Sequence, residues 1–240
     1  MGDLLEPVNV IKRMYEAGKF KEMAEYCSEL LQKNPKDLIA LQNITTAYIQ
    51  LGKYEEALKY CDIVLSMNNK DDYALKNKII LLENLRRFDQ VLSCCDALLA
   101  QNQTDAWVLN TKGLVLNELD QHEEAILFYD KTLSIDPTNV TALINKANSK
   151  SYLGKYSQAI ELYDKAQSLD PTIKGLPIAK SKLFEKLGKE DEAFLAAQGV
   201  LLKDMEKIIR DAQRNGCTVF HQFCEKEFEE LHAKGRQPKT

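Results

Sequence analysis

Residues 106–139 read AWVLNTKGLVLNELDQHEEAILFYDKTLSIDPTN, and residues 140–173 read VTALINKANSKSYLGKYSQAIELYDKAQSLDPTI. When the two stretches are aligned without a gap, Ala125 matches Ala159 and Tyr129 matches Tyr163. The Asp-Pro pair at 136–137 likewise matches the one at 170–171. A fixed period of this length is typical of proteins built from stacked, near-identical helical hairpins, each of which contacts only its neighbours. This period decides the fold class.

The same period extends in both directions along the 240 residues. Apolar residues recur at helical spacing on both sides of one turn in each repeat, which predicts two amphipathic helices per repeat. We therefore expect an all-α array over 4–207 with about six repeats: 4–37, 38–71, 72–105, 106–139, 140–173 and 174–207. Positions within each repeat are numbered 1 to 34 below.

The turn between the two helices is marked at repeat position 15. Four of the six residues there are glycines, which indicates a backbone with positive φ. Arg86 and Asp120 stand at this position in the third and fourth repeats, and arginine is the poorest fit. An aromatic ring or a histidine follows at position 17 in five repeats. Proline at position 32 (Pro35, Pro137 and Pro171) stops the second helix in three of them.

Small residues at positions 8 and 20 permit the two helices of a hairpin to approach closely, as at Ala147 and Ala159. Larger pairs, such as Ile79 and Val91, predict wider hairpins in the first and third repeats. With the period, the aromatic position and the proline, this pattern resembles the tetratricopeptide repeat family over about 4–207. The chain departs from the family at position 4, where the family favours tryptophan. The resemblance implies a right-handed α-solenoid of antiparallel helix pairs, a concave groove lined by the first helices, and no catalytic activity.

The end of the chain leaves the repeat pattern. Because no proline interrupts 190–214, we expect one helix to run through this stretch and to stop at Asn215-Gly216. Val219, Phe220, Phe223, Phe228 and Leu231 recur on one face of a further predicted helix, 218–233. We assign 208–234 as a helix extension and capping helix, because terminal repeats need a cap with a polar outer side. The last residues, 235–240, are expected to be disordered.

Six asparagines are candidates for binding a partner. If the first helices line a groove, positions 2, 5, 6, 9, 12 and 13 face it, and position 6 carries asparagine in four repeats. An amide offers both a donor and an acceptor, so such a ladder can hold the backbone of an extended peptide. The alternative is that asparagine at this position indicates only that the groove can bind a ligand and does not point to a particular one. The candidates are Asn9, Asn43, Asn77, Asn110, Asn145 and Asn148.

An apolar patch is the second candidate feature. Tyr73 and Trp107 both stand at position 2 and are expected to neighbour each other, with Ile80 and Leu114 deeper on the same wall. Exposed aromatic and aliphatic side chains inside a groove form anchoring pockets. Alternatively, the rings fold back onto the preceding turn and only seal the stack.

Charge and composition exclude several classes of function. A net charge of −4 argues against a dedicated nucleic-acid binder, which needs clustered Lys and Arg. The N-terminus lacks the basic start and the apolar run that would indicate a signal peptide, and no apolar run is long enough to span a membrane. We expect a cytoplasmic protein. Cys27, Cys61 and Cys95 share one repeat position, so they are expected to be small buried hydrophobes and not a disulfide framework.

Catalytic, cofactor and metal sites are not predicted. The sequence has no glycine-rich phosphate loop and no nucleophile with a partnered base at a suitable spacing. Cys217, His221 and Cys224 could share one helix face, but Phe220, Phe223 and Cys224 form an ordinary packing stripe with His221 at its edge, and we favour that interpretation over a metal site. The Lys and Asn pattern with which some members of the family clamp the C-terminal carboxylate of chaperones is missing: Lys76 is the only lysine at position 5.

These observations predict a non-enzymatic scaffold that holds an extended segment of another protein or peptide in the groove. The alternative is a self-associating structural module, a homodimer formed through residues 218–233. We expect no cofactor, no metal, no nucleic acid and no membrane among the partners.

Overall fold

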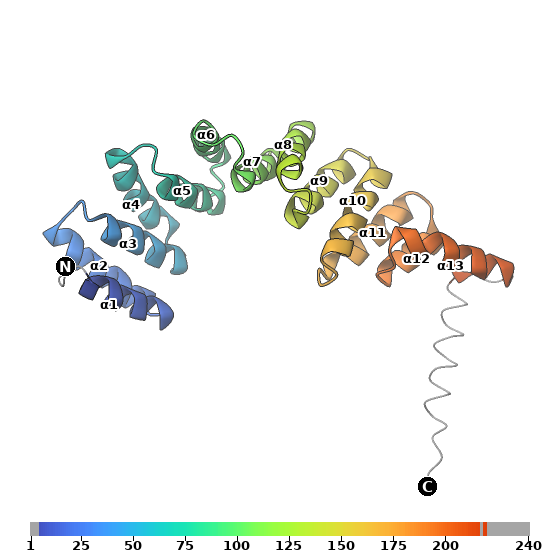
Figure 1. The fold of residues 1–240 in the computed structure, drawn as a ribbon, viewed down its shortest axis with the longest axis horizontal. Coiled ribbons are helices and arrows are strands. Elements are labelled where there is room, and N and C mark those ends of the chain that lie inside the picture. Colours follow the sequence, from blue (N-terminus) through green and yellow to red (C-terminus); the bar gives the residue numbers. More distant parts are fainter. Residues whose placement is uncertain (1–4, 217, 220–240) are drawn as a thin grey trace, which may run out of the picture. The chain divides into compact units, whose positions relative to one another are not determined.

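The computed structural model describes residues 5–216 and 218–219. In this part of the chain there are thirteen helices and no strand (Figure 1), which confirms the all-α class. The chain divides into two compact units, Met1–Leu119 and Asp120–Thr240, and each is described by itself.

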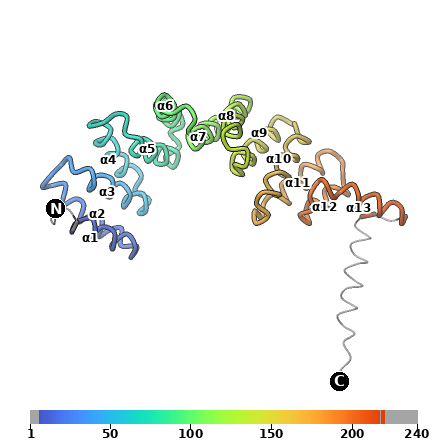
Figure 2. Tube along the Cα trace, viewed as in Figure 1, coloured from blue at the N-terminus to red at the C-terminus, as the bar shows by residue number. Residues whose placement is uncertain are grey.

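The N-terminal unit is a stack of helical hairpins. Each helix packs against the one that precedes it in the sequence, as the trace in Figure 2 follows from blue to green. The buried core between them consists of aliphatic side chains, alanines and cysteines. The helices are α1 (Leu5–Glu16), α2 (Phe20–Lys33), α3 (Leu38–Gln50), α4 (Tyr54–Met67), α5 (Asp72–Asn84), α6 (Phe88–Leu99) and α7 (Ala106–Glu118).

The C-terminal unit repeats this arrangement and then departs from it. Its core joins Ala147 and Ala159 to larger side chains such as Leu183 and Phe184. The helices are α8 (His122–Ile135), α9 (Val140–Tyr152), α10 (Tyr156–Leu169), α11 (Gly175–Lys186), α12 (Glu190–Ala197) and α13 (Leu202–Arg214).

The predicted turn at repeat position 15 is confirmed at all six places. The four glycines have positive φ, and so do the two exceptions, Arg86 with φ 54° and Asp120 with φ 59°. Because the following aromatic or histidine begins the second helix in five hairpins, as Phe20 begins α2, the turn and the helix start form one local unit. The repeat therefore imposes its backbone even where the residue is unfavourable.

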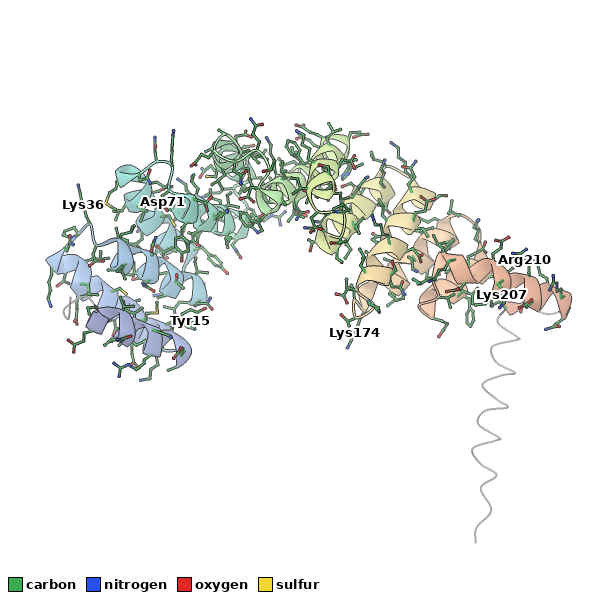
Figure 3. The ribbon with its side chains drawn as sticks, in the orientation of Figure 1. Tyr15, Lys36, Asp71, Lys174, Lys207 and Arg210 are labelled. Carbon is green, nitrogen blue, oxygen red and sulfur yellow. The ribbon has the colours of Figure 1, made fainter. Side chains whose placement is uncertain are left out.

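The first helices start with a side-chain cap that the repeat analysis did not use. Asp37, Asp71, Asp105 and Asn139 stand at position 34, and each carboxylate or amide oxygen accepts a hydrogen bond from a backbone amide in the first turn of the next helix, over 2.8–3.1 Å. Asp71 is labelled at the loop before α5 in Figure 3. Such caps satisfy otherwise unpaired N–H groups and define where each first helix begins.

The cysteines confirm the expected packing role. Cys27, Cys61 and Cys95 are buried and free, each within a second helix. Burial raises the pKa of each of these thiols to about 12, which makes them poor nucleophiles at neutral pH. Ala147 and Ala159, which are small residues at positions 8 and 20 of the same repeat, are also buried.

One helix prediction is wrong. Residues 190–214 do not form one helix, because α12 ends at Ala197 and α13 begins at Leu202, with Gly199 between them at φ 81°. Side chains of α10 form hydrogen bonds with two backbone groups at this break. The Gln167 amide donates to the Gly199 carbonyl over 2.7 Å, and the Leu202 N–H donates to the Asp164 carboxylate over 3.0 Å. The predicted end of the helix, before Asn215-Gly216, is confirmed.

A lysine at repeat position 7 forms an ion pair with an aspartate at position 25 of the preceding repeat. Three of these pairs lie near the surface. In the fourth, the Lys180 side chain is fully buried, and its ammonium lies 2.9 Å from Asp164 and 3.2 Å from the Val200 carbonyl. The pairs are Lys78–Asp62, Lys112–Asp96, Lys146–Asp130 and Lys180–Asp164.

Several sequence predictions fall on residues that the structure does not describe. These are most of the capping helix, 220–233, the predicted dimer contact within it, the tail 235–240 and the Cys217, His221 and Cys224 face. No described helix combines the length and the apolar composition that crossing a membrane would require.

Candidate functional site

The first helices α3, α5 and α7 of the N-terminal unit present a common surface, which we call the first-helix face. Two contacts connect these helices: the Tyr73 hydroxyl on α5 lies 3.4 Å from the Thr46 hydroxyl on α3, and the Lys76 ammonium on α5 lies 2.9 Å from Asp105, the cap of α7. The face therefore carries side chains from three successive hairpins.

Both aromatic candidates are exposed on this face. Tyr73 is 47% exposed and Trp107 is 41% exposed. Each also leans toward the preceding first helix, because Tyr73 contacts Thr46 and the Lys76 ammonium lies 6.0 Å from the centre of the Trp107 ring. No ring–ring contact joins Tyr73 to Trp107 among the described residues. Both expectations for the rings therefore hold in part. One side of each ring contacts the preceding first helix, as sealing of the stack requires, and the rest of the ring is accessible to a ligand.

Lys76 lies between two carboxylates on the same face. Its ammonium is 3.1 Å from Asp72 and 2.9 Å from Asp105. The hydrogen bond to Asp105 raises the pKa of Lys76. Burial alone would raise the pKa of Asp105, but hydrogen bonds from Lys76 and from the Val108 amide outweigh it and leave that pKa below its ordinary value. Lys76 is therefore neutralised locally and is not a free cation for a ligand carboxylate.

The asparagine candidates of the N-terminal unit differ in how they are bound. Asn77 on α5 is half-buried, and its side chain makes no hydrogen bond within the described part of the chain. The Asn43 amide donates to the Ile39 carbonyl over 2.8 Å, which leaves its oxygen able to accept. Asn9 on α1 is exposed and Asn110 on α7 is half-buried. Asn77 thus keeps the hydrogen-bonding capacity of its side chain for a ligand, and so does Asn9, whereas Asn43 uses one of its N–H groups within α3.

The remaining two asparagines lie in the C-terminal unit on α9. Asn145 is half-buried. The oxygen of Asn148 accepts a hydrogen bond from the Tyr163 hydroxyl on α10, so this amide helps to hold its own hairpin together. Since one lone pair of that oxygen is occupied, Asn148 keeps its N–H groups and one acceptor site for a ligand.

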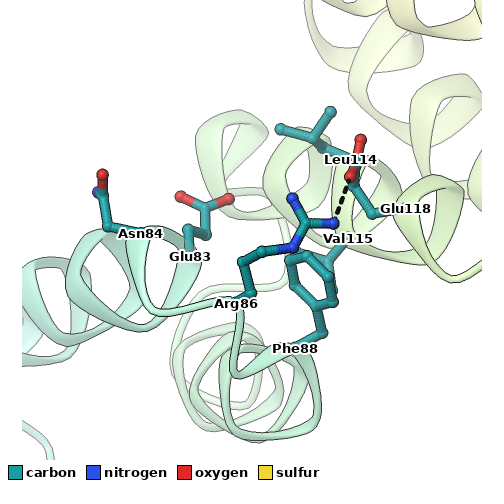
Figure 4. Close-up of a pocket in the computed structure, with 7 residues that line it drawn as sticks. All are labelled: Glu83, Asn84, Arg86, Phe88, Leu114, Val115 and Glu118. Carbon is teal, nitrogen blue, oxygen red and sulfur yellow. Dashed lines mark hydrogen bonds and ion pairs between the residues drawn. The ribbon is translucent and has the colours of Figure 1, made fainter.

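Ile80 and Leu114 complete the apolar candidates, at 36% and 37% exposure. Leu114 also lines a cavity of about 310 Å³ between the C-terminal halves of α5 and α7 (Figure 4). Phe88 and Val115 add to its apolar lining. Its polar lining comes from Glu83, Asn84, Arg86 and Glu118.

The charged residues of this cavity were missed by the sequence analysis. Glu83 and Glu118 occupy positions 12 and 13, which were expected to face the groove, but their charge was not considered. The Arg86 guanidinium lies 3.5 Å from Glu118 and 5.1 Å from the Phe88 ring centre. The Glu83 side chain is half-buried and forms no ion pair or hydrogen bond with any described residue, and burial raises the pKa of its carboxyl.

No group of three or more His, Cys, Asp or Glu side chains that could hold a metal ion occurs in the described part of the chain.

Comparison with known families gives three matches. Residues 48–149 match the N-terminal repeat region of Psidin, a tetratricopeptide repeat model. Two models of the tetratricopeptide repeat itself match 14–79 and 140–173, and the latter range is the second of the two aligned stretches of 34 residues. No curated protein sequence matches the chain.

Solved structures with the same fold are similar at low sequence identity. A tetratricopeptide repeat protein from Parabacteroides merdae is 23% identical with a TM-score of 0.72, and the match covers 81% of this chain and 77% of that one. MamA from Desulfovibrio magneticus is 22% identical with a TM-score of 0.66, over 72% and 98% of the two chains. YrrB, described as a repeat protein with an unusual peptide-binding site, is 14% identical with a TM-score of 0.58, over 72% and 89%.

Proposed function

The chain belongs to the tetratricopeptide repeat family, and from that premise we propose that it is an interaction scaffold whose first-helix face holds an extended segment of a partner protein. Proteins of this family are generally non-enzymatic scaffolds. The single observation that carries the proposal is the row of half-exposed apolar side chains, Tyr73, Trp107, Ile80 and Leu114, on neighbouring first helices of one compact unit.

Apolar exposure on this scale favours a binding role. Large aromatic side chains bury much area when a partner covers them, and they dominate the energetics of interfaces. Tyr73 and Trp107 are held in place by Thr46 and Lys76. Because each ring already contacts a neighbouring side chain in the free protein, less conformational entropy is lost when a partner binds.

The polar side chains between the rings suit a peptide backbone better than a charged terminus. Asn77 can donate and accept, and Asn43 can still accept, so together they match the alternating N–H and C=O groups of an extended chain. Lys76 is engaged by Asp72 and Asp105. We therefore infer that recognition on this face uses backbone contacts and apolar anchors.

YrrB supports the proposal by likeness only. Its description names a peptide-binding site, and it shares the fold of this chain. At 14% identity that likeness shows the fold and carries no residue of its site to this chain. Asn145 and Asn148 of the C-terminal unit remain candidate contacts, with Asn148 restricted by its bond to Tyr163.

Selection from a library of random displayed dodecapeptides tests the proposal. Bound peptides should change the emission of Trp107, the only tryptophan in the chain. The double variant Asn77→Ala, Trp107→Ala should weaken binding of a labelled selected peptide about thirtyfold or more, since a buried aromatic anchor contributes roughly 2 kcal/mol or more. Circular dichroism should show unchanged helicity.

Leu127→Ala is the matched control, because Leu127 is 60% exposed on the second helix α8 and lies outside the first-helix face. Unchanged affinity in the double variant, or an equal loss in the control, would contradict the proposal. The self-associating alternative predicts a dimer, detected by light scattering, that dissociates when the chain is cut after residue 214. The scaffold proposal predicts that this truncation leaves the number of chains per particle unchanged.

A further inference from the structure

We propose that the cavity between α5 and α7 receives a long basic side chain, arginine or lysine, with Glu83 as its counter-ion. The inference deepens the proposed function and rests on it, because the basic side chain would belong to the segment held on the first-helix face. It predicts that the bound segment carries a positive charge, which neither the apolar row nor the asparagines would require.

The lining of the cavity matches the two chemical parts of such a side chain. Phe88, Leu114 and Val115 offer apolar contact, and Glu83 and Glu118 offer carboxylates, as Figure 4 shows. Arginine and lysine carry an apolar stem with the charge at its end, so they bury the stem against apolar surface while the charge reaches polar groups. A cavity of about 310 Å³ is large enough for one such side chain.

Glu83 is the group that lacks a partner. Its carboxylate is half-buried, yet no described residue forms an ion pair or a hydrogen bond with it. Removing an ionised carboxylate from water without a compensating partner costs free energy. The raised pKa of Glu83 has the same origin. A bound cation would supply the missing partner and recover part of that cost.

The cation already in the cavity does not satisfy this need. Arg86 is directed to Glu118, as the dashed line in Figure 4 shows, and its guanidinium packs over Phe88. Two carboxylates against one guanidinium leave a formal charge of −1 at the lining. An acidic side chain that reached Arg86 would lie near both Glu83 and Glu118, which like-charge repulsion disfavours. The charges therefore favour a cation.

Continuity with the first-helix face connects the two sites. Leu114 lines the cavity and is also one of the exposed apolar residues of that face. Ile80 lies one helical turn before Glu83 and Asn84 on α5. A segment lying over Ile80 and Leu114 therefore passes the cavity, and one of its side chains can enter it.

Nuclear magnetic resonance of the isotope-labelled full chain tests the inference with acetyl-arginine amide as the probe. Acetyl-citrulline amide is the control compound, because citrulline has the shape of arginine without its charge. The arginine compound should shift the amide signals of 83–88 and 114–118 and bind about tenfold or more tightly than the citrulline compound. Glu83→Gln should abolish this difference.

Glu123→Gln is the matched control variant, since it removes the same charge from an exposed position on α8 and should keep the difference. Equal binding of the two compounds, signals that shift only elsewhere, or preferential binding of acetyl-glutamate amide would overturn the inference. The assay needs no partner peptide, so its failure leaves the scaffold proposal standing. Failure of the peptide selection, in turn, would leave a positive arginine result intact.

Discussion

The buried ion pair between Lys180 and Asp164 leads to the most demanding prediction. The side chains of Lys180 and Asp164 are 0% and 16% exposed, and the aspartate also accepts the Leu202 N–H that starts α13. Asp164→Ala removes the counter-ion and leaves a fully buried ammonium with only the Val200 carbonyl. Breaking one side of a buried pair costs about 3–5 kcal/mol, because the other charge stays buried without compensation.

The repeat supplies an internal control for this variant. Asp62 holds the same repeat position and pairs with Lys78 at 2.7 Å, but these side chains are 54% and 23% exposed. Exposed pairs contribute about 0.2–1 kcal/mol, because water replaces the lost contact. The same substitution at equivalent positions should therefore differ by roughly 2–4 kcal/mol in the free energy of unfolding, because of the burial of Lys180 and the additional hydrogen bond from Leu202 to Asp164.

Urea denaturation followed by circular dichroism measures the difference, and native-state hydrogen exchange locates it. Asp164→Ala should lower the protection of amides in α11 and α13, the helices that meet at Asp164, without changing α3 or α5. Adding Lys180→Met should restore most of the loss, because an apolar residue of similar length suits a buried site. Equal costs for Asp164→Ala and Asp62→Ala, or no recovery with Lys180→Met, would refute this reasoning.

Further predictions concern the turns, the hairpin core and the cavity. Arg86→Gly should raise the free energy of unfolding by roughly 0.5–1 kcal/mol, since glycine removes the strain of φ 54° while adding entropy to the unfolded chain; a drop in urea midpoint would contradict this. Ala159→Leu, at a fully buried position facing Ala147, should cost about 1–3 kcal/mol by overpacking, and an unchanged melting temperature would disprove the close approach. The pKa of Glu83 is raised in the folded state by burial, so the folded state binds this proton more tightly than the unfolded state, and the free energy of unfolding falls as pH rises through that pKa. Glu83→Gln should therefore stabilise the protein at pH 7, and urea denaturation should show this advantage vanishing at pH values below the ordinary glutamate pKa.

Most of the local structure could be predicted from the repeat. Positive φ at position 15 was expected from four glycines, and the structure extends it to Arg86 and Asp120. The aspartates that cap the first helices were also readable, because Asp37, Asp71 and Asp105 recur at one position. These features depend on residues a few positions apart, so a repeated sequence is sufficient to reveal them.

The candidate site was predictable only in outline. Positions 2 and 9 correctly indicated exposed apolar residues, but the cavity beside Leu114 could not be expected, since it depends on how α5 and α7 pack. The hydrogen bond that occupies Asn148 was also hidden, because its partner Tyr163 lies on another helix. A ladder of identical residues therefore conceals different environments.

The sequence alone determined the helical class, the period, the turns and the helix starts, since each follows from interactions within a few residues along the chain. Only the tertiary structure decided that the chain breaks at Gly199, where side chains from α10 satisfy backbone groups more than thirty residues away. It also decided which of the four equivalent lysines is buried and that the Glu83 carboxylate has no ion-pair or hydrogen-bond partner among the described residues. Burial and pairing depend on what a neighbouring helix places over a residue, and a repeated sequence does not contain that information.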